Sequence, residues 1–201
     1  ESVEDLIHEG AATARRTHAG FLSVLEHKRP VVMLKVGTSL DGRIATHTGQ
    51  SQWITGEAAR ARAHLMRARF DAILVGLGTA LADDPSLTCR LPGLEDRSPT
   101  RVVLDSHLRL PLTANLVQTA TDVRTIIVTR EGADKARRKA FEKAGVEVIS
   151  IAPPKDGAEG VPLDRTLEEL ALRGVTRLLV EGGSQVAGGL LALGLVDMIG
   201  W

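Results

Sequence analysis

Aromatic side chains are scarce in this chain: they make up 2% of its 201 residues, with three Phe, two Trp and no Tyr. Proteins that bind single-stranded nucleic acids stack the bases on aromatic rings, and few such rings are available here. An excess of one charge is also missing, because 25 Lys and Arg balance 25 Asp and Glu. Without a positive field to hold a polyanionic backbone, nucleic-acid binding is not expected.

Cysteine and long apolar runs are lacking as well. The one cysteine, Cys89, cannot form an internal disulfide, which fits a reducing compartment. A two-cysteine zinc site is impossible and the six His residues show no ligand spacing, so we expect no metal. No apolar stretch reaches the roughly 18 residues that span a bilayer, and the acidic start ESVEDLIHEG is unlike a signal peptide. These absences predict a soluble, cytoplasmic protein with no membrane partner.

The chain does contain a regular alternation of apolar and amphipathic segments from Pro30 onward. Short runs rich in Val, Ile and Leu are typical of strands, and the segments between them have helical spacing. The expected strands are residues 31–36, 72–76, 101–104, 124–129, 146–151 and 177–180, and the expected helices are residues 57–70, 133–144, 163–173 and 185–193. Near-continuous apolar strands separated by helices predict an α/β fold with a mostly parallel sheet.

The two ends of the chain differ from this pattern. Residues 1–29 are polar and helix-friendly, with expected breaks at Gly10 and Gly20, and are typical of a lead-in or linker. Residues 30–201 form the expected domain. A further strand begins in the apolar residues 197–201, so we expect the native domain to continue beyond them. Within the domain, Thr55 is the expected cap of helix 57–70, and Gly145 the expected left-handed end of helix 133–144.

The sharpest local signal is a buried strand that runs through Glu181, Gly182 and Gly183 into a helix. Such a junction exposes backbone amides, and a helix N-terminus favours an anion. A tight turn without any ligand is the alternative reading. A second junction, Gly76-Leu77-Gly78, lacks the third glycine of the dinucleotide fingerprint, so a Rossmann fold is not supported. A dinucleotide can still be held at two glycine turns of another parallel sheet.

Three further segments carry candidate residues with two readings each. The side chain of Trp53 either packs in the protein interior or lines a ligand site. Asp83 and Asp84 precede Pro85 and form either a local Asx turn or a pair of functional carboxylates. Charged residues on helix 57–70 normally face solvent, but one arginine turned inward can hold a phosphate in fork geometry. The arginines considered there are Arg62, Arg67 and Arg69.

Four motifs stand in order along the chain: KVGTSLDGR from Lys35, SQWIT from Ser51, LADDPSLT from Leu81 and EGGS from Glu181. Together they closely resemble the reductase domain of the bifunctional riboflavin-biosynthesis deaminase/reductase, over residues 30 to 197. The resemblance implies a dihydrofolate-reductase-like fold, with C-terminal strands beyond Trp201. It also implies NADPH-dependent reduction of 5-amino-6-(5-phosphoribosylamino)uracil, a small phosphorylated substrate, to its ribityl counterpart. A homodimer is implied as well.

The resemblance also assigns roles to individual positions. Implied NADP contacts are Gly37, Trp53, Thr79, Asp83, Ser106, Gly183, Ser184, Gln185, Val186, Ala187, Gly188 and Gly189. Implied substrate contacts are Ser51, Arg67, Leu87, Arg90 and Glu181, with Lys35 close by. The family's zinc deaminase ligands are absent here, so no deaminase activity is expected. Residues 1–29 resemble the end of that upstream deaminase domain and its linker.

Reduction at the ribosyl C1′ needs a proton for the ring oxygen. Asp83 and Lys35 are the first candidates for the proton donor or orienting group, whereas Glu181 is expected to hold the pyrimidine or the ribose. The resemblance implies Ser106 at the 2′-phosphate site, and Arg130 is a second candidate from its position at a strand end. Two alternatives stay open: a reductase of the undeaminated 2,5-diamino pyrimidinone or of a pterin, and an NADP-binding module without catalysis.

Overall fold

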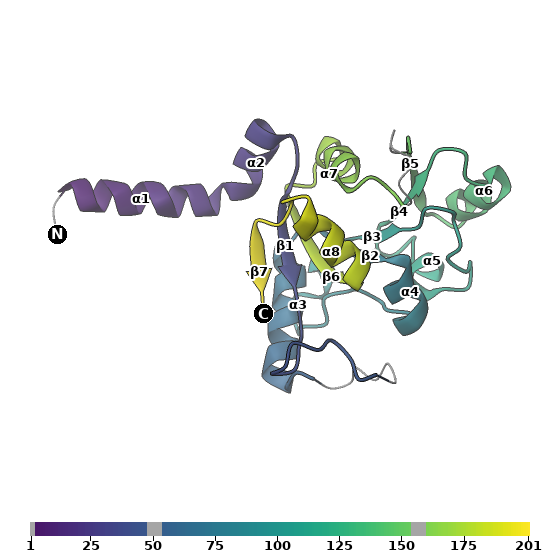
Figure 1. Ribbon diagram of the computed structural model, residues 1–201, viewed down its shortest axis with the longest axis horizontal. Coiled ribbons are helices and arrows are strands. Elements are labelled where there is room, and N and C mark those ends of the chain that lie inside the picture. The colour runs from purple at the N-terminus through teal and green to yellow at the C-terminus, as the bar shows by residue number, and fades with distance from the viewer. Residues whose placement is uncertain (1–2, 48–53, 154–159) are drawn as a thin grey trace.

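The computed structural model describes residues 3–47, 54–153 and 160–201, with side chains from residue 10 onward. Its centre is a sheet of parallel strands, in the order β5-β4-β3-β2-β6-β1-β7 (Figure 1). The strands are β1 (Val31–Lys35), β2 (Ala72–Gly76), β3 (Thr100–Leu104), β4 (Thr125–Arg130), β5 (Glu147–Ile151), β6 (Arg177–Gly182) and β7 (Met198–Gly200). The α/β fold with a parallel sheet is therefore confirmed.

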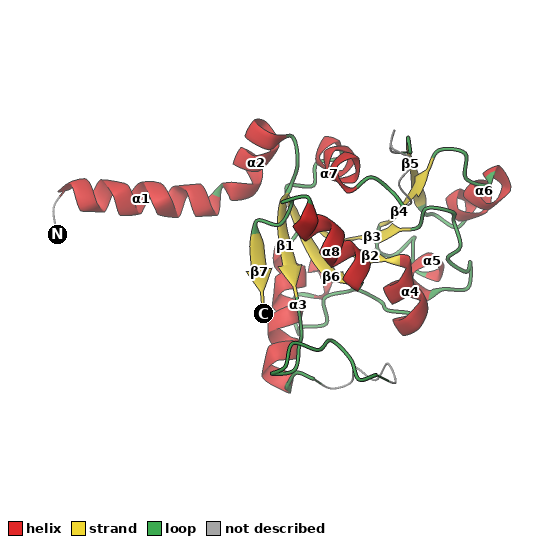
Figure 2. Ribbon diagram, in the orientation of Figure 1, coloured by secondary structure: helices red, strands yellow, loops and turns green. Residues whose placement is uncertain are grey.

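Helices cover both faces of this sheet (Figure 2). They are α1 (Val3–Thr17), α2 (Ala19–His27), α3 (Glu57–Arg69), α4 (Leu77–Asp83), α5 (Asn115–Gln118), α6 (Lys135–Lys143), α7 (Leu163–Leu172) and α8 (Ser184–Ala192), with a short 3₁₀ turn, η1 (Glu95–Arg97). None of them, within the part of the chain that is described, is long and apolar enough to cross a membrane.

The core consists of two apolar layers, one on each face of the sheet. In β2, Ile73 and Val75 point into the layer covered by α4, α5 and α6, whereas Ala72 and Leu74 point into the layer covered by α7 and α8. Successive side chains of a strand point to opposite faces, and here both faces are buried. This is why β2 has an uninterrupted apolar sequence rather than an alternating one.

The order of the strands reverses beside β2, and we use the word crevice below for the region just beyond the carboxyl ends of the strands at this reversal. Strands β2 to β5 follow one another outward, and the chain then returns through α7 to insert β6 between β2 and β1. In open parallel sheets, ligands bind beyond the carboxyl ends of the strands where the strand order reverses. The ends of β1, β6 and β2 therefore mark the candidate site.

All six expected strands and all four expected helices are present, and the strand expected near residues 197–201 is β7. Helix α3 begins at Glu57 as expected, but the expected cap is wrong: the N-cap residue is Gly56, whose backbone is extended, and no side chain caps the helix. Gly145 does follow α6 with a φ of +87°, as expected. The sequence reading missed α4 and α5, which are short and follow glycine- or proline-containing segments.

The lead-in is helical, and its glycines are not breaks. Gly10 lies inside α1 and Gly20 inside α2, while the chain changes direction at His18 between them. A Cβ on Gly20 would lie 2.9 Å from the carbonyl oxygen of Thr176, so this glycine allows α2 to approach the start of β6. Helix α1 projects away from the rest of the molecule (Figure 1).

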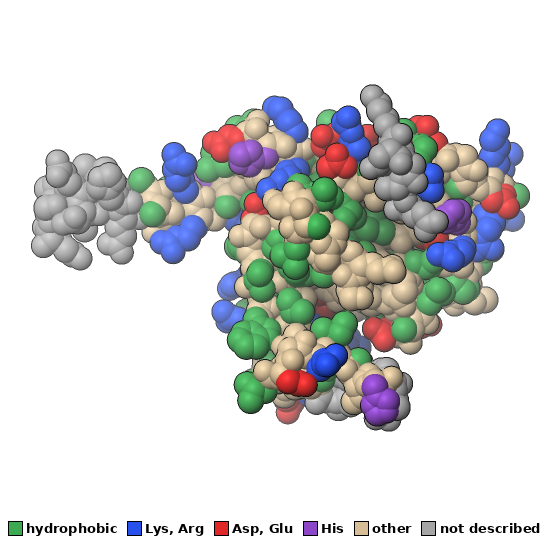
Figure 3. Space-filling model, in the orientation of Figure 1, with side chains coloured by type: hydrophobic (Ala, Val, Ile, Leu, Met, Phe, Trp, Pro, Cys, Tyr) green, Lys and Arg blue, Asp and Glu red, His purple; other side chains and the backbone are tan. Residues whose placement is uncertain are grey.

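Exposed apolar side chains gather on α8 and β7 (Figure 3). Leu191 and Leu193 lie at the end of α8, and Ile199 and Trp201 are 62% and 85% exposed. The remaining surface in this view mixes both charges, in keeping with the balanced composition.

Candidate active site

A buried carboxylate held between two cations occupies the crevice. Glu181 lies near the end of β6, and its side chain is 6% exposed. Arg67 of α3 donates from Nε and Nη2 to the two carboxylate oxygens, each at 2.8 Å. Lys35, the last residue of β1, places Nζ 3.8 Å from Oε2. Two cations and one anion leave this cluster with a net positive charge.

Arg67 also forms a hydrogen bond with the segment that follows α4. Its Nη1 donates to the carbonyl oxygen of Thr88 at 3.0 Å. The arginine was expected to hold a substrate phosphate in its fork, and here the fork holds Glu181. Arg67 therefore orders three parts of the crevice: the end of β6, the segment around residue 88 and α3 itself.

Glycines at the end of β6 bring its backbone close to α4. Gly183 has a φ of +90°, a conformation that favours glycine. A Cβ on Gly182 would lie 3.0 Å from Oγ1 of Thr79, and one on Gly183 would lie 3.6 Å from it. Thr79 and the Gly183 turn, which the sequence reading treated as two halves of one binding site, thus lie together at the same edge of the sheet.

The N-terminus of α8 has no side-chain cap, because its N-cap residue is Gly183. The first amides of a helix lack intrahelical partners, and the macrodipole makes this end positive. Helix α6 is different, since Oδ1 of Asp134 accepts hydrogen bonds from the amides of Ala136 and Arg137 at 2.7 and 3.2 Å. The start of α8 is therefore the better anion site of these two helices.

The residues of α8 named by the resemblance face different surroundings. Ser184, Gln185 and Gly188 are exposed, and Ala187 is half-buried. Val186 is buried in the core, where its side chain also limits the space at Gly76. A Cβ on Gly189 would lie 2.8 Å from Cδ1 of Leu163, so this glycine allows α8 to pack against α7.

The segment that carries Arg90 is attached to α3 through His64. Nδ1 of His64 accepts a hydrogen bond from the backbone amide of Arg90 at 3.2 Å, and its carbonyl oxygen accepts one from Sγ of Cys89 at 3.4 Å. Burial, followed by the charges of Arg67 and Arg90, lowers the pKa of His64 below its usual 6.5. The imidazole is therefore neutral at pH 7, as its role of acceptor requires. The side chain of Arg90 itself is exposed.

Sequence reasoning missed His64. The available signal was its position three residues before Arg67, which places both side chains on one side of α3. Leu87, expected to contact the substrate, has its side chain buried in the core, so only its backbone can reach a ligand.

Asp83 and Asp84 have separate roles. Asp83 is the last residue of α4 and is exposed. Asp84 has a φ of +38°, and its Oδ1 accepts a hydrogen bond from the backbone amide of Asn115 at 2.8 Å. This contact joins the end of α4 to α5 over a distance of 31 residues, so Asp84 serves the fold through a long-range bond rather than a local turn.

Ser106 and Arg130, the two residues considered for a 2′-phosphate, are neighbours. They follow β3 and end β4, and the amide of Arg130 donates to the carbonyl oxygen of Ser106 at 3.4 Å. The fully buried Asp105 holds this turn by accepting a hydrogen bond from the amide of Leu110 at 2.7 Å. Gly37 follows β1 near Thr55: a Cβ added to it would lie 3.6 Å from Cγ2 of Thr55.

Ser51 and Trp53 lie outside the described residues. Within the described ranges, no group of His, Cys, Asp or Glu is arranged to hold a metal ion.

A family model described as the RibD C-terminal domain matches residues 30–200. Riboflavin biosynthesis protein RibD of Actinobacillus pleuropneumoniae is 40% identical over 179 residues, which cover 89% of this chain and 46% of that protein. The 2,5-diamino-6-ribosylamino-4(3H)-pyrimidinone 5′-phosphate reductase of Archaeoglobus fulgidus is 37% identical over 180 residues, which cover 85% of this chain and 78% of that protein. The chain thus spans about half the length of the RibD relative.

Solved structures agree with this match. The diaminohydroxyphosphoribosylaminopyrimidine deaminase/5-amino-6-(5-phosphoribosylamino)uracil reductase of Thermotoga maritima superimposes with a TM-score of 0.74 at 32% identity, covering 94% of this chain and 48% of that chain. RibD of Acinetobacter baumannii gives a TM-score of 0.75 at 33% identity, covering 92% and 49%. From the family model, the relatives and the shared fold, we conclude that this chain belongs to the RibD C-terminal domain family.

Proposed function

We propose that the chain is a riboflavin-biosynthesis reductase that transfers a hydride from NADPH to the ribosyl C1′ of 5-amino-6-(5-phosphoribosylamino)uracil. The observation that carries this proposal is the position of an uncapped helix N-terminus at Gly183, two residues after a carboxylate held by Lys35 and Arg67. An anion site and a cluster of ionisable groups therefore share one crevice. Membership of the family and the names of the relatives support a riboflavin-biosynthesis reductase, and the name of the Thermotoga maritima protein includes the deaminated substrate proposed here.

The crevice has features that suit NADPH, which supplies the hydride when bound. The free amides at the start of α8 suit its pyrophosphate, and the hydroxyl of Thr79 lies beside them. Ser106 and Arg130 lie farther along the same edge of the sheet, beyond β2, where an extended dinucleotide would place its 2′-phosphate. Gly37 and Asp83 would contribute further contacts.

The substrate would bind on the other side of the Glu181 carboxylate. Arg90 is exposed and carries a guanidinium without a side-chain partner among the described residues, so it is suited to the substrate's phosphate. Arg67 would reinforce this charge while it holds Glu181 in place. Glu181 would accept hydrogen bonds from the pyrimidine or the ribose.

Hydride addition at C1′ breaks the bond between C1′ and the ring oxygen, and that oxygen must take a proton. We assign this proton to Lys35, because its ammonium group lies in the crevice beside Glu181. Asp83 is exposed at the end of α4, where a contact with the cofactor is its expected role.

The test is an assay of NADPH oxidation with this chain and the deaminated substrate, followed by the loss of NADPH absorbance and by mass analysis of the product. Formation of the ribitylamino product supports the proposal. If NADPH binds but is not oxidised with any ribosylaminopyrimidine phosphate, the chain is a binding module and the proposal fails.

A second candidate is the reductase of the undeaminated substrate. Archaeal relatives from Archaeoglobus fulgidus and Methanothermobacter thermautotrophicus carry the name 2,5-diamino-6-ribosylamino-4(3H)-pyrimidinone 5′-phosphate reductase, at 37% and 38% identity. The two substrates differ by an amino group in place of a carbonyl oxygen on the pyrimidine. The ratio of kcat/KM for the two, measured side by side, decides between them.

The proposal includes a homodimer in the cytoplasm. A molar mass near twice 21.5 kDa in light scattering supports the dimer, and a mass near 21.5 kDa contradicts it.

A further inference from the structure

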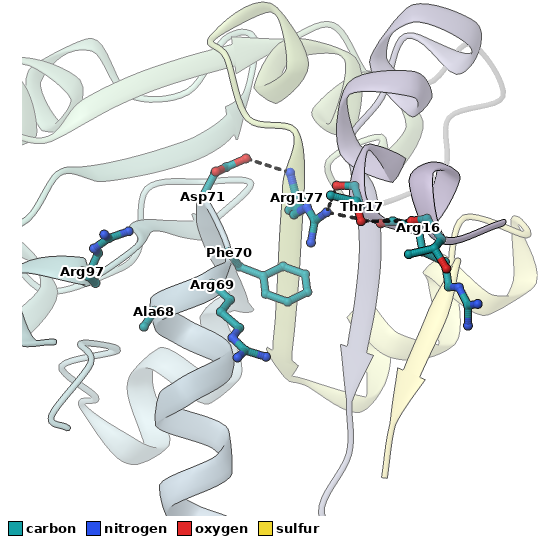
Figure 4. Close-up of a pocket in the computed structure, with 9 residues that line it drawn as sticks. Arg16, Thr17, Ala68, Arg69, Phe70, Asp71, Arg97 and Arg177 are labelled. Atoms are coloured by element: carbon teal, nitrogen blue, oxygen red, sulfur yellow. Dashed lines mark hydrogen bonds between the residues drawn. The ribbon is translucent and has the colours of Figure 1, made fainter. Parts of the chain in front are cut away.

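A cavity of about 800 Å³ lies at the edge of the sheet opposite the candidate active site. Its lining comes from Arg16 at the end of α1, Arg69 and Phe70 at the end of α3, Arg97 of η1 and Arg177 at the start of β6 (Figure 4). Because the strands are parallel, the start of β6 and the crevice at its end belong to opposite edges. This cavity is therefore separate from the Glu181 site.

The cavity is strongly cationic. Four arginines and a single carboxylate, Asp71, line it, which gives a net charge of +3. The chain as a whole has no net charge at pH 7, so this concentration of arginines is not a property of the average surface.

Asp71 does not neutralise these arginines. Its Oδ2 accepts hydrogen bonds from the amide and hydroxyl of Thr176, both at 2.7 Å, and from the amide of Arg177 at 2.9 Å. The side chains of Arg16, Arg69 and Arg97 have no ion pair or hydrogen bond with any residue that the structure describes. Their donors are therefore available to a ligand.

Arg177 is fixed before any ligand arrives. Its Nη2 donates to the carbonyl oxygen of Thr17 at 2.7 Å and lies 3.5 Å from that of Arg16 (Figure 4). These bonds hold the half-buried guanidinium at the junction of α1 and β6. A guanidinium that is already ordered loses little side-chain entropy on binding, which favours a specific site over a diffuse charged surface.

We propose that this cavity binds a small phosphorylated molecule of the size of a nucleoside diphosphate. Arginine matches the geometry of phosphate with paired hydrogen bonds, and several arginines without carboxylate partners select for a polyanion. The volume falls within the roughly 300–1,000 Å³ of small-molecule sites and exceeds what a single inorganic phosphate needs. Arg16 belongs to α1 and the other three arginines to the sheet domain, so the ligand would contact both the C-terminal end of α1 and that domain.

The test is calorimetric titration of the chain with ADP and with inorganic pyrophosphate at low salt. The double variant Arg69→Gln/Arg97→Gln removes two exposed cavity arginines that make no bond to a described residue. The matched control, Arg62→Gln, removes an exposed arginine of α3 that does not line the cavity. The double variant is expected to bind ADP and pyrophosphate at least about tenfold more weakly, and the control to stay within about twofold of the unchanged chain.

Equal unfolding temperatures for the unchanged chain, the double variant and the control would exclude loss of the fold as the cause of weaker binding. If the double variant binds ADP as tightly as the unchanged chain, ADP binds elsewhere and the proposal is wrong. It is equally wrong if neither ADP nor pyrophosphate binds the unchanged chain at about 1 mM, a concentration that detects binding free energies of about −4 kcal/mol. Neither result bears on the reductase activity, because the Glu181 site is unchanged in all variants.

Discussion

Lys35 and Asp83 are both ionisable and both lie at the ends of elements on the crevice side of the sheet, but their surroundings differ. Lys35 lies 3.8 Å from a carboxylate that Arg67 holds in place. Asp83 lies at the exposed end of α4. A group that delivers a proton must be positioned against the reacting atom, and a partner such as Glu181 supplies that positioning for Lys35.

Replacing Lys35 should therefore cost more than replacing Asp83. We expect Lys35→Gln to lower kcat at least about 100-fold, equivalent to about 2.7 kcal/mol, because it removes the proposed proton donor. Asp83→Asn should lower kcat less than about tenfold and act mainly on the KM for NADPH. Steady-state rates at saturating pyrimidine substrate and varied NADPH concentration give both the kcat and the KM for NADPH. The opposite order of effects would identify Asp83 as the donor.

His64 makes the crevice sensitive to pH. Its folded pKa is lowered, so between that pKa and 6.5 the unfolded chain binds more protons than the folded chain. The contribution of His64 to stability is therefore complete above 6.5 and is lost as the pH falls through the folded pKa. Protonation also removes the Nδ1 acceptor that holds the amide of Arg90.

We accordingly expect the KM for the phosphorylated substrate to rise as the pH falls below 6.5. The variant His64→Asn keeps an acceptor at this position but does not titrate, so its KM should change less over the same range. His107→Asn, at an exposed position, serves as the control. Identical pH profiles for His64→Asn and the unchanged chain would show that His64 does not position Arg90.

At the scale of elements, the backbone geometry of the junction between β6 and α8 creates the proposed anion site. The positive φ of Gly183 turns the chain into α8 and leaves the first amides of the helix uncapped. The sequence identified this junction because two glycines between a strand and a helix are a local pattern. The same local reasoning placed the cap of α3 at Thr55 instead of Gly56, since the entry to a helix depends on the preceding loop as well as on the capping residue.

Gly183→Ala should affect both stability and cofactor binding. Alanine at the φ of +90° and ψ of +109° of this residue costs about 1–3 kcal/mol, so the free energy of unfolding should fall by that amount. A shift of this strained turn would move the first amides of α8, and NADPH binding should weaken at least about tenfold.

Gly78→Ala is the matched control for Gly183→Ala. Gly78 lies inside α4, where a Cβ meets nothing within 4 Å, and the replacement should raise the free energy of unfolding by about 0.5–1 kcal/mol. Denaturant unfolding and fluorescence titration with NADPH measure the two effects. Unchanged NADPH affinity in Gly183→Ala would argue against the start of α8 as the pyrophosphate site.

At the scale of the whole molecule, one ion pair joins the beginning of the sheet domain to its last described strand. Arg29, before β1, donates to both carboxylate oxygens of Asp197, before β7, at 2.6 and 2.8 Å. The backbone amide of Val32 donates to Oδ2 of the same carboxylate at 2.8 Å. Burial opposes ionisation, but the hydrogen bonds from Arg29 and Val32 lower the pKa of Asp197 below 3.8 overall.

This pair should contribute to stability against acid. With a folded pKa below 3.8, the contribution of Asp197 is complete above that pH and is lost as the pH falls through the folded value. Asp197→Asn should lower the free energy of unfolding at pH 7 by about 1–3 kcal/mol and flatten its decline below about pH 4. Urea unfolding at several pH values tests this. An equally steep decline in the variant would assign the acid sensitivity to other carboxylates.

The sequence by itself determined the α/β class, the six main strands and the glycine turn at Gly183, because each rests on a local pattern of burial or backbone freedom. It also named Lys35, Arg67 and Glu181 as candidates. Only the tertiary structure decided that Arg67 pairs with Glu181, 114 residues away, and that four arginines from α1, α3, η1 and β6 surround one cavity. Such contacts depend on the order of the strands in the sheet and on long side chains that reach from one element to another. Neither of these features produces a periodic pattern in the sequence.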